Sequence, residues 1–143
     1  MKITGFKIIK RKIVNSKKGD ILKYLTKNDV FYKKFGEIYF SEVLKNKVKG
    51  WNLHKKNRCL LVVPHGKVIF HFIDGRKNLS SFYNEKKIVL SKKNYKLVLV
   101  PPKVWFSFKS LSKISIVANC LEIPHSDNET LKVDKLKKYK IPN

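Results

Sequence analysis

The stretch RCLLVVPHGKVIFHFID, residues 58–74, decides the fold class. Two apolar, β-branched runs flank Pro64, His65 and Gly66, and this turn signal predicts a hairpin. Within residues 68–74 both alternate faces are largely apolar, whereas a strand with one face in water would alternate apolar and polar side chains. We therefore expect a strand that is covered on both sides, as in a sandwich or a closed barrel.

Short strand-like runs continue on both sides of this stretch. They are rich in β-branched and aromatic residues, follow no helical period, and occupy residues 36–44, 86–91, 95–102, 105–111 and 114–123. This pattern predicts an all-β sandwich or barrel, in one domain that spans residues 1–143. The segment before residue 37 could hold a turn of helix or a short strand, and the basic tail from residue 131 is expected to pack loosely or fray.

The chain is strongly basic, with 33 Lys and Arg against 10 Asp and Glu and a formal net charge of +23. Such a charge suggests nucleic acid or an anionic membrane surface as a partner. However, Arg11, Arg58 and Arg76 are the only arginines, and the lysines are dispersed along the whole chain. Phosphate-binding surfaces usually rely on arginine forks and one-sided clusters. We therefore expect a solvated lysine coat and keep a basic nucleic-acid-binding β domain as an alternative.

Neither a membrane span nor a disulfide framework is expected. No run approaches the roughly 20 apolar residues that span a bilayer, and the N-terminal stretch lacks the apolar run of a signal peptide. We therefore expect a cytoplasmic protein. Cys59 and Cys120 each lie inside an apolar run, which predicts buried free thiols.

His54 lies in the most informative surroundings of the four histidines. A metal-binding β-barrel would carry a second His or a Glu close to it, but Lys55, Lys56 and Arg58 follow His54, and no carboxylate occurs before Asp74. These cations would repel a divalent ion, so we expect no metal. The other histidines are expected to be a turn residue, a core or interface residue, and a loop residue of little weight: His65, His71 and His125.

An ordered series of short motifs runs through residues 37–129. The motifs are Lys49-Gly50, His54, Gly66, Asp74 with Arg76, Ser81-Phe82, Leu90-Ser91, Asn94, Val100-Pro101-Pro102, Phe108 and Leu111-Ser112. In this order they resemble the dTDP-4-dehydrorhamnose 3,5-epimerase family of the cupin superfamily. The resemblance implies a cupin-type jelly roll, or double-stranded β-helix barrel, in a homodimer that exchanges N-terminal strands. It also implies a nucleotide-linked 4-keto-6-deoxy sugar as substrate, a role in surface polysaccharide (lipopolysaccharide) biosynthesis, and no cofactor.

The resemblance also assigns roles to single residues. His54 aligns with the family's base, because a positioned histidine can remove the acidic proton next to a ketone. Arg58 is the cation that remains near the family's lysine position, and a nearby cation would stabilise the enolate. The candidates for substrate binding are Lys49, Lys55 and Lys56, which could face a diphosphate, and Trp105, which could stack on a base or sugar ring.

The sequence departs from the family at three supporting positions. Phe70 replaces an aspartate, Phe106 replaces a histidine, and residues 121–123 lack the tyrosine that would donate a proton. The His-Lys-Lys run that begins at His54 also resembles the sugar 3,4-ketoisomerases, although Asn52 stands where those enzymes carry a second histidine. We therefore expect an epimerase, a ketoisomerase, or a catalytically degenerate sugar-binding cupin.

Overall fold

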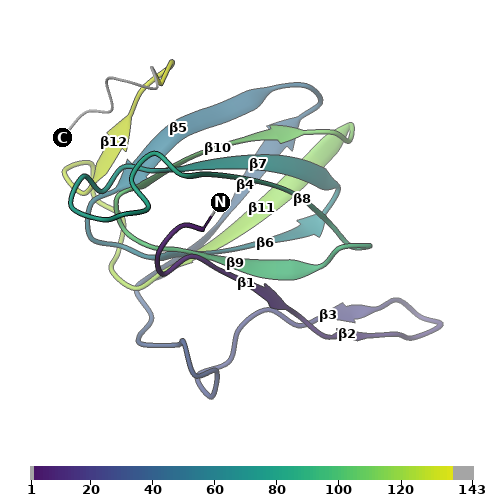
Figure 1. Ribbon diagram of the computed structural model, residues 1–143. Coiled ribbons are helices and arrows are strands. Elements are labelled where there is room, and N and C mark those ends of the chain that lie inside the picture. The colour runs from purple at the N-terminus through teal and green to yellow at the C-terminus, as the bar shows by residue number, and fades with distance from the viewer. Residues whose placement is uncertain (1, 137–143) are drawn as a thin grey trace.

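Two five-stranded antiparallel sheets form the body of the computed structural model, which describes residues 2–136 (Figure 1). The first sheet has the order β1 (Lys7–Lys10), β9 (Lys96–Val100), β6 (Cys59–His65), β11 (Ile114–Leu121) and β4 (Glu37–Leu44). The second has the order β12 (Thr130–Lys132), β5 (Val48–His54), β10 (Val104–Ser110), β7 (Lys67–Asp74) and β8 (Glu85–Ser91). A separate hairpin consists of β2 (Ile13–Val14) and β3 (Ile21–Leu22).

The all-β prediction is confirmed, because residues 2–136 contain no helix. It follows that this part of the chain holds no helix long and apolar enough to cross a membrane. The ambiguous N-terminal segment resolves into the short strands β1, β2 and β3 and into turns. From β4 to β12 the chain changes sheet at every connection except the one from β7 to β8. This alternation between facing sheets is the jelly-roll pattern.

The predicted hairpin at Gly66 is wrong. The turn exists, but it does not close a hairpin, because β6 pairs with β9 and β11 while β7 pairs with β10 and β8. Gly66 has φ 79° and carries the chain from one sheet to the other. A Cβ there would lie 2.3 Å from the Ser115 Oγ and 2.7 Å from the Ile114 carbonyl oxygen, so only glycine fits.

The main core lies between the two sheets. Its buried side chains come from both of them and include a run of ring contacts among Phe70, Phe72, Phe106 and Phe108. Phe70 and Phe106, which replace polar residues of the epimerase family, are thus part of this core and are buried. Burial of such rings is the main favourable term in a fold of this kind.

The outer faces of both sheets are covered as well, which explains the apolar character of both faces of the central strands. On the first sheet, side chains between residues 9 and 31 pack over a second buried cluster that includes Leu60 and Val62 of β6. On the second sheet, Phe82 and Tyr83 cover Trp105, together with apolar residues from the segment 131–136. The first part of the basic tail is therefore packed, contrary to prediction, while residues 137–143 lie outside the described residues.

Strand β5, which ends at His54, has no clear sequence signal. Its pairing with β10 shifts register, so that Phe106 faces Asn52 but Phe108 faces Lys49. The bulge contains Gly50, which has φ 109°; a Cβ on it would lie 2.7 Å from the Phe106 carbonyl oxygen. A bulge changes the direction of the side chains that follow it. Here the strand continues from the bulge to His54, four residues after Gly50.

Candidate active site

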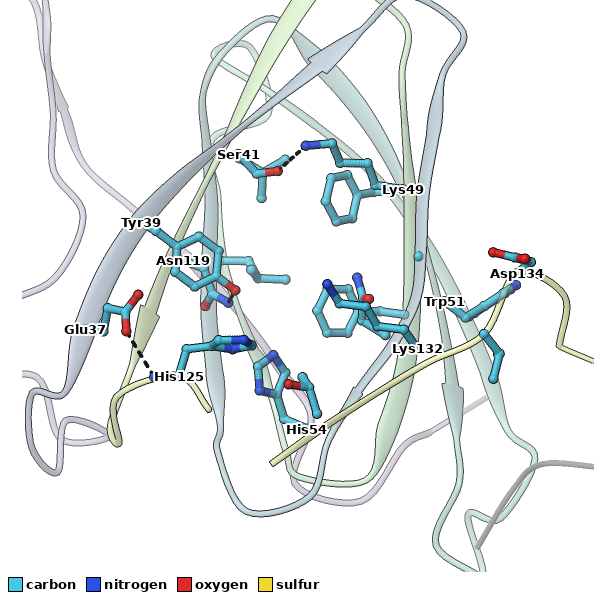
Figure 2. Close-up of a pocket in the computed structure, with 18 residues that line it drawn as sticks. Glu37, Tyr39, Ser41, Lys49, Trp51, His54, Asn119, His125, Lys132 and Asp134 are labelled. Carbon is cyan, nitrogen blue, oxygen red and sulfur yellow. Dashed lines mark hydrogen bonds between the residues drawn. The ribbon is translucent and has the colours of Figure 1, made fainter. Parts of the chain in front are cut away.

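A pocket of about 900 Å³ lies between the two sheets (Figure 2). Its walls come from β4 and β11 on one side and from β5, β10 and β12 on the other, and its apolar lining includes Leu61, Phe106, Phe108 and Val117. Polar side chains line the rest of the pocket, among them Tyr39, Lys49, Asn52, His54, Asn119 and Lys132. A concave site with an apolar wall and a few convergent polar groups is typical of a small-molecule site.

His54 is held by Glu129, which lies just before β12. The two side chains are only 4% and 8% exposed, and the His54 Nδ1 lies 2.7 Å from the Glu129 Oε2. The other oxygen of the Glu129 carboxylate, Oε1, accepts hydrogen bonds from the backbone N–H groups of Lys56 and Asn57 at 2.9 and 2.8 Å. The His54 Nε2 has no hydrogen-bond partner among residues 2–136 and belongs to the wall of the pocket.

The protonation states of this pair follow from their surroundings. Burial opposes ionisation of Glu129, but the backbone N–H groups of Asn57 and Lys56 and the contact with His54 outweigh it and lower its pKa. An ionised carboxylate can only accept, so the Nδ1 of His54 must carry the proton. Burial lowers the pKa of His54 below its usual value, and the contact with Glu129 offsets only part of this effect. The neutral ring therefore has its lone pair on Nε2.

Tyr39 projects into the pocket from β4, across from His54. Its hydroxyl oxygen accepts a hydrogen bond from the Asn119 Nδ2 at 2.9 Å, and both residues line the pocket. Burial raises the pKa of Tyr39 to about 12, so its phenol stays protonated near neutral pH. Since Asn119 donates to the phenol oxygen, the O–H proton of Tyr39 can point elsewhere, and Tyr39 can act as a proton donor.

The charged side chains around the pocket are of both signs. The Lys49 Nζ donates to the Ser41 Oγ at 2.9 Å, and His125 donates its backbone N–H to the Glu37 Oε1 at 3.0 Å (Figure 2). Lys132 lies on the same side as His54, and neither of the two pocket lysines forms an ion pair with a carboxylate within residues 2–136. These two cations are therefore available to an anionic ligand.

Of the residues predicted for the site, the structure brings together His54 and Lys49 but not the others. Lys55 and Lys56 are exposed and do not line the pocket. The Arg58 guanidinium points away from it, to Glu122 and to the Phe31 carbonyl oxygen. Trp105 is fully buried on the outer side of the second sheet, where no ring of a ligand could stack on it.

The remaining histidines differ in how far they match their expected roles. His65 is exposed at the end of β6, in the turn before Gly66. His71 lies on the outer face of the second sheet, where its Nε2 is 3.0 Å from the Glu85 Oε2 and its ring packs edge to face against Trp51. His125 lies in a loop, as expected, but it also lines the pocket, and Figure 2 shows its ring beside that of His54.

Sequence reasoning missed Glu129, Tyr39, Asn119 and Lys132. Glu129 is 75 positions from His54 and lies in a polar loop without any recognisable pattern. Tyr39 did leave a signal: in GEIYFSEVL the positions of Glu37, Tyr39 and Ser41 are polar while the alternate positions are mostly apolar. The structure shows that the polar face of this strand points into the pocket.

No three His, Cys, Asp or Glu side chains in the part of the chain that the structure describes come together as a group that could hold a metal ion. Cys59 and Cys120 are free and buried, as predicted. Burial raises the pKa of Cys59 to about 12, so this thiol is not a nucleophile at neutral pH. The reactive groups of the pocket are therefore the imidazoles of His54 and His125, the phenol of Tyr39, two ammonium groups, and the carboxylates of Glu37 and Asp134.

A comparison with known protein families shows to which family the chain belongs. The sequence model of a family described as FdtA, WxcM-like C-terminal, matches residues 4–134. The chain belongs to this FdtA family. It is 32% identical to a dTDP sugar isomerase from Desulfovibrio desulfuricans G20, whose crystal structure superposes with a TM-score of 0.89 over 92% of this chain and 85% of that one. No curated protein sequence matches the chain.

More distant structures share the fold of this FdtA-family chain. A dTDP-4-dehydrorhamnose 3,5-epimerase from Bacillus anthracis str. Ames, with TDP and PPi bound, is 20% identical; its TM-score is 0.83, over 91% of this chain and 79% of that one. A 3,5-epimerase from Legionella pneumophila Philadelphia 1, in complex with dTDP-4-keto-L-rhamnose, is 19% identical; its TM-score is 0.83, over 93% and 74%. The predicted resemblance to epimerase-like cupins and the predicted jelly roll are thus confirmed.

Proposed function

We propose that this protein is an isomerase or epimerase of a dTDP-linked, or other nucleoside-diphosphate-linked, 4-keto-6-deoxy sugar. The His54–Glu129 pair carries the proposal, because it leaves a neutral imidazole nitrogen on the wall of a polar pocket. The dTDP sugar isomerase that is 32% identical to this chain supports the substrate class. The proposed pathway is surface polysaccharide biosynthesis, as the resemblance to the epimerase family implies.

The proposed reaction begins at the carbon next to the ketone. The His54 Nε2 removes the proton from C3, and the electron pair of the C–H bond forms a double bond between C3 and C4, with negative charge on O4. Glu129 stabilises the imidazolium that results, since it already bonds to the other nitrogen. A proton donor near O4 stabilises the enolate, and Tyr39 is the candidate in this pocket.

Two products can follow from this enolate. If His54 returns its proton to C4, and the hydroxyl proton of O3 moves to O4, the ketone has shifted to C3. If a group on the opposite face, such as Tyr39, protonates C3 instead, the configuration at C3 is inverted. Membership in the FdtA family and the identity to a dTDP sugar isomerase favour the first outcome.

The diphosphate of the substrate needs cations at the mouth of the pocket. Lys49 and Lys132 line it from β5 and β12, and their ammonium groups can approach phosphate oxygens as point charges. Lys55 and Lys56, which the sequence suggested for this role, lie outside the pocket. We therefore assign the diphosphate to Lys49 and Lys132.

The test is to incubate the purified protein with dTDP-4-keto-6-deoxyglucose and to identify the product by NMR. A ketone at C3 would establish the isomerase, and inversion at C3 or C5 would establish the epimerase. The control is His54→Asn, which keeps a polar side chain but cannot act as a base. An unchanged sugar that still binds, as judged by thermal shift with dTDP, would contradict catalysis and leave a sugar-binding cupin.

We propose, further, that the protein is a homodimer. Strand β4 is the edge of the first sheet, and its outward face exposes Ile38, Phe40 and Leu44, with Ile114 of β11 beside them. Phe40 is 69% exposed. Glu42 also lies on this face and is exposed, but the other three residues of the face are apolar. A largely apolar outward face on an edge strand, opposite a polar inner face, is unfavourable for a monomer. A second copy of this chain is the occupant that the resemblance to the epimerase family implies.

A further inference from the structure

The short turn after His54, residues 55–58, contacts both ends of the loop 122–129, which joins β11 to β12. At the first end, Asn57 forms two hydrogen bonds with one loop residue: its Nδ2 donates to the Ile123 carbonyl oxygen at 3.0 Å, and its Oδ1 accepts the Ile123 N–H at 2.9 Å. Asn57 is only 1% exposed. Arg58 adds an ion pair with Glu122 beside these bonds.

At the second end, the backbone of the same turn surrounds Glu129. The N–H groups of Lys56 and Asn57 donate to its Oε1, and the N–H of Lys55 donates to its carbonyl oxygen at 2.8 Å. These bonds fix the plane of the carboxylate and direct its Oε2 at the Nδ1 of His54. The turn therefore holds Glu129 in the position from which it orients His54, the candidate base.

Between its two ends the loop has little support from packing. Residues 123–128 are all exposed. Within the described residues, the hydrogen bond from the His125 N–H to Glu37 is the one that ties this stretch to the far wall of the pocket. The pairing of β12 with β5 holds the chain directly after Glu129, and the turn holds the loop at both of its ends. Asn57 is the residue of the turn that contacts both ends at once.

We propose that Asn57 is a positioning residue that holds the loop 122–129 so that Glu129 fixes the ring orientation and the tautomer of His54. The proposal rests on the proposed role of His54 as the base. It also gives a role to the turn after His54, which contacts the loop through the backbone N–H groups of Lys55 and Lys56 and lies outside the pocket.

The groups that face His54 indicate how its protonation would change if the turn no longer held the loop 122–129. Glu129, on the loop, raises the pKa of His54, while His125, on the same loop, and Lys132, on β12, lower it. If Glu129 moves away, the contact that raises the pKa is lost. We therefore expect the Nδ1 of His54 to lose the partner that holds the proton there, so that its tautomers mix and its pKa shifts from the wild-type value.

A Glu129→Gln variant provides the reference state. The carbonyl oxygen of the new amide would accept the two backbone N–H groups of Lys56 and Asn57, so the amide NH₂ group would face His54. An NH₂ group requires an acceptor, which forces the proton of the neutral ring from Nδ1 to Nε2. The pocket-facing nitrogen then has no lone pair, and this wrong tautomer costs roughly 10⁴-fold in a comparable triad.

The experiment is an NMR titration of ¹⁵N-labelled full-length protein that reads the pKa and the tautomer of His54 without any substrate. Asn57→Ser removes both side-chain bonds to the loop, and Asn57→Asp, which removes only the donor, serves if the first variant does not fold. Asn94→Ser is the matched control, because Asn94 also donates to a backbone carbonyl, that of Val89, away from the pocket. Glu129→Gln and the double variant with Asn57→Ser complete the set.

We expect Asn57→Ser to mix the tautomers of His54 and to shift its pKa from the wild-type value, and Asn94→Ser to leave both as in the wild type. In the Glu129→Gln background, Asn57→Ser should add nothing, because it acts through Glu129. A His54 titration in Asn57→Ser that matches the wild type, or an effect that adds in full to that of Glu129→Gln, would overturn the proposal.

Turnover is a separate readout on the same samples. We expect Asn57→Ser to lower kcat by roughly 10- to 100-fold with a smaller change in KM, since it misplaces the base and leaves the binding groups in place. A wild type with the expected His54 titration but without any proton exchange on the keto sugar would support the positioning role and contradict the proposed function. The two failures are therefore distinguishable.

Discussion

His54 combines a fixed ring with a low affinity for protons, and both properties come from its neighbours. Burial lowers its pKa, so it is neutral at pH 7 without being a strong base. Glu129 then decides which nitrogen is the base, because an ionised carboxylate leaves the lone pair on Nε2. A general base suits its task best when it is unprotonated at the working pH and is held at the proton that it removes.

This arrangement predicts the acid limb of the pH profile. The base works only when His54 is unprotonated, so kcat/KM should rise with pH through the pKa of His54 and stay level above it. Since that pKa lies below 6.5, the midpoint should also lie below 6.5. Initial rates with the keto sugar between pH 5 and pH 8, beside an NMR titration of His54, measure it. A midpoint above pH 7 would contradict the assignment.

Single residues show how far sequence reasoning can go at this site. His54 and Lys49 could be found because they lie in an ordered series of motifs that resembles a known family. Glu129 could not, since its partner is 75 positions away and only the pairing of β12 with β5 brings them together. Arg58 was chosen because it lies near the position of the family's lysine, but its guanidinium points to Glu122 and to the Phe31 carbonyl oxygen, away from the pocket.

Strands differ in how clearly the sequence marks them. β7 spans the predicted residues 67–74, because a long apolar run bounded by Gly66 and Gly75 leaves little doubt about its ends. β5 was missed, since its bulge at Gly50 breaks the alternation on which a strand prediction depends. β12 was missed because three residues carry no period, and its strand forms only through pairing with β5.

The crossover at Gly66 allows a stability prediction with a close control. Gly66→Ala places a Cβ 2.3 Å from the Ser115 Oγ at φ 79°, whereas Gly5→Ala has nearly the same φ, 77°, and meets only Pro101 at 3.8 Å. We expect Gly5→Ala to cost about 1 kcal/mol from backbone strain alone, and Gly66→Ala roughly 3 kcal/mol because the clash adds to the strain. Urea unfolding of both variants measures the difference. Equal losses would show that the crossover tolerates a side chain.

Across the whole molecule, the charge has a simple distribution. Each of the three arginines forms an ion pair with a carboxylate: Arg11 with Asp29, Arg58 with Glu122, and Arg76 with Asp74. The arginines are therefore used within the fold and not on a phosphate-binding surface. The net charge of +23 thus comes from the lysines, which are dispersed along the whole chain. This distribution fits a solvated coat better than a nucleic-acid interface.

The proposed homodimer makes a prediction at the same scale. Phe40→Glu replaces the most exposed apolar side chain on the outward face of β4 with a second charge beside Glu42 and should raise the dimer dissociation constant by about 30-fold or more. Val30→Glu is the control, because Val30 is fully exposed but does not lie on this sheet. Analytical ultracentrifugation of the two variants and the wild type gives the answer. A wild type that stays monomeric, or a Phe40→Glu variant that stays dimeric, would contradict the proposed interface.

The central claim is that His54 removes a proton from the carbon next to a sugar ketone. Its most direct test is an NMR measurement of dTDP-4-keto-6-deoxyglucose with the protein in deuterated water, with His54→Asn in parallel. We predict that deuterium enters at C3 or, after the ketone has moved, at C4, and that the variant loses this exchange by a factor of roughly 10³ or more. Exchange or product formation at the same rate in His54→Asn, or neither deuterium exchange nor an isomerised product with the wild type, would contradict the claim.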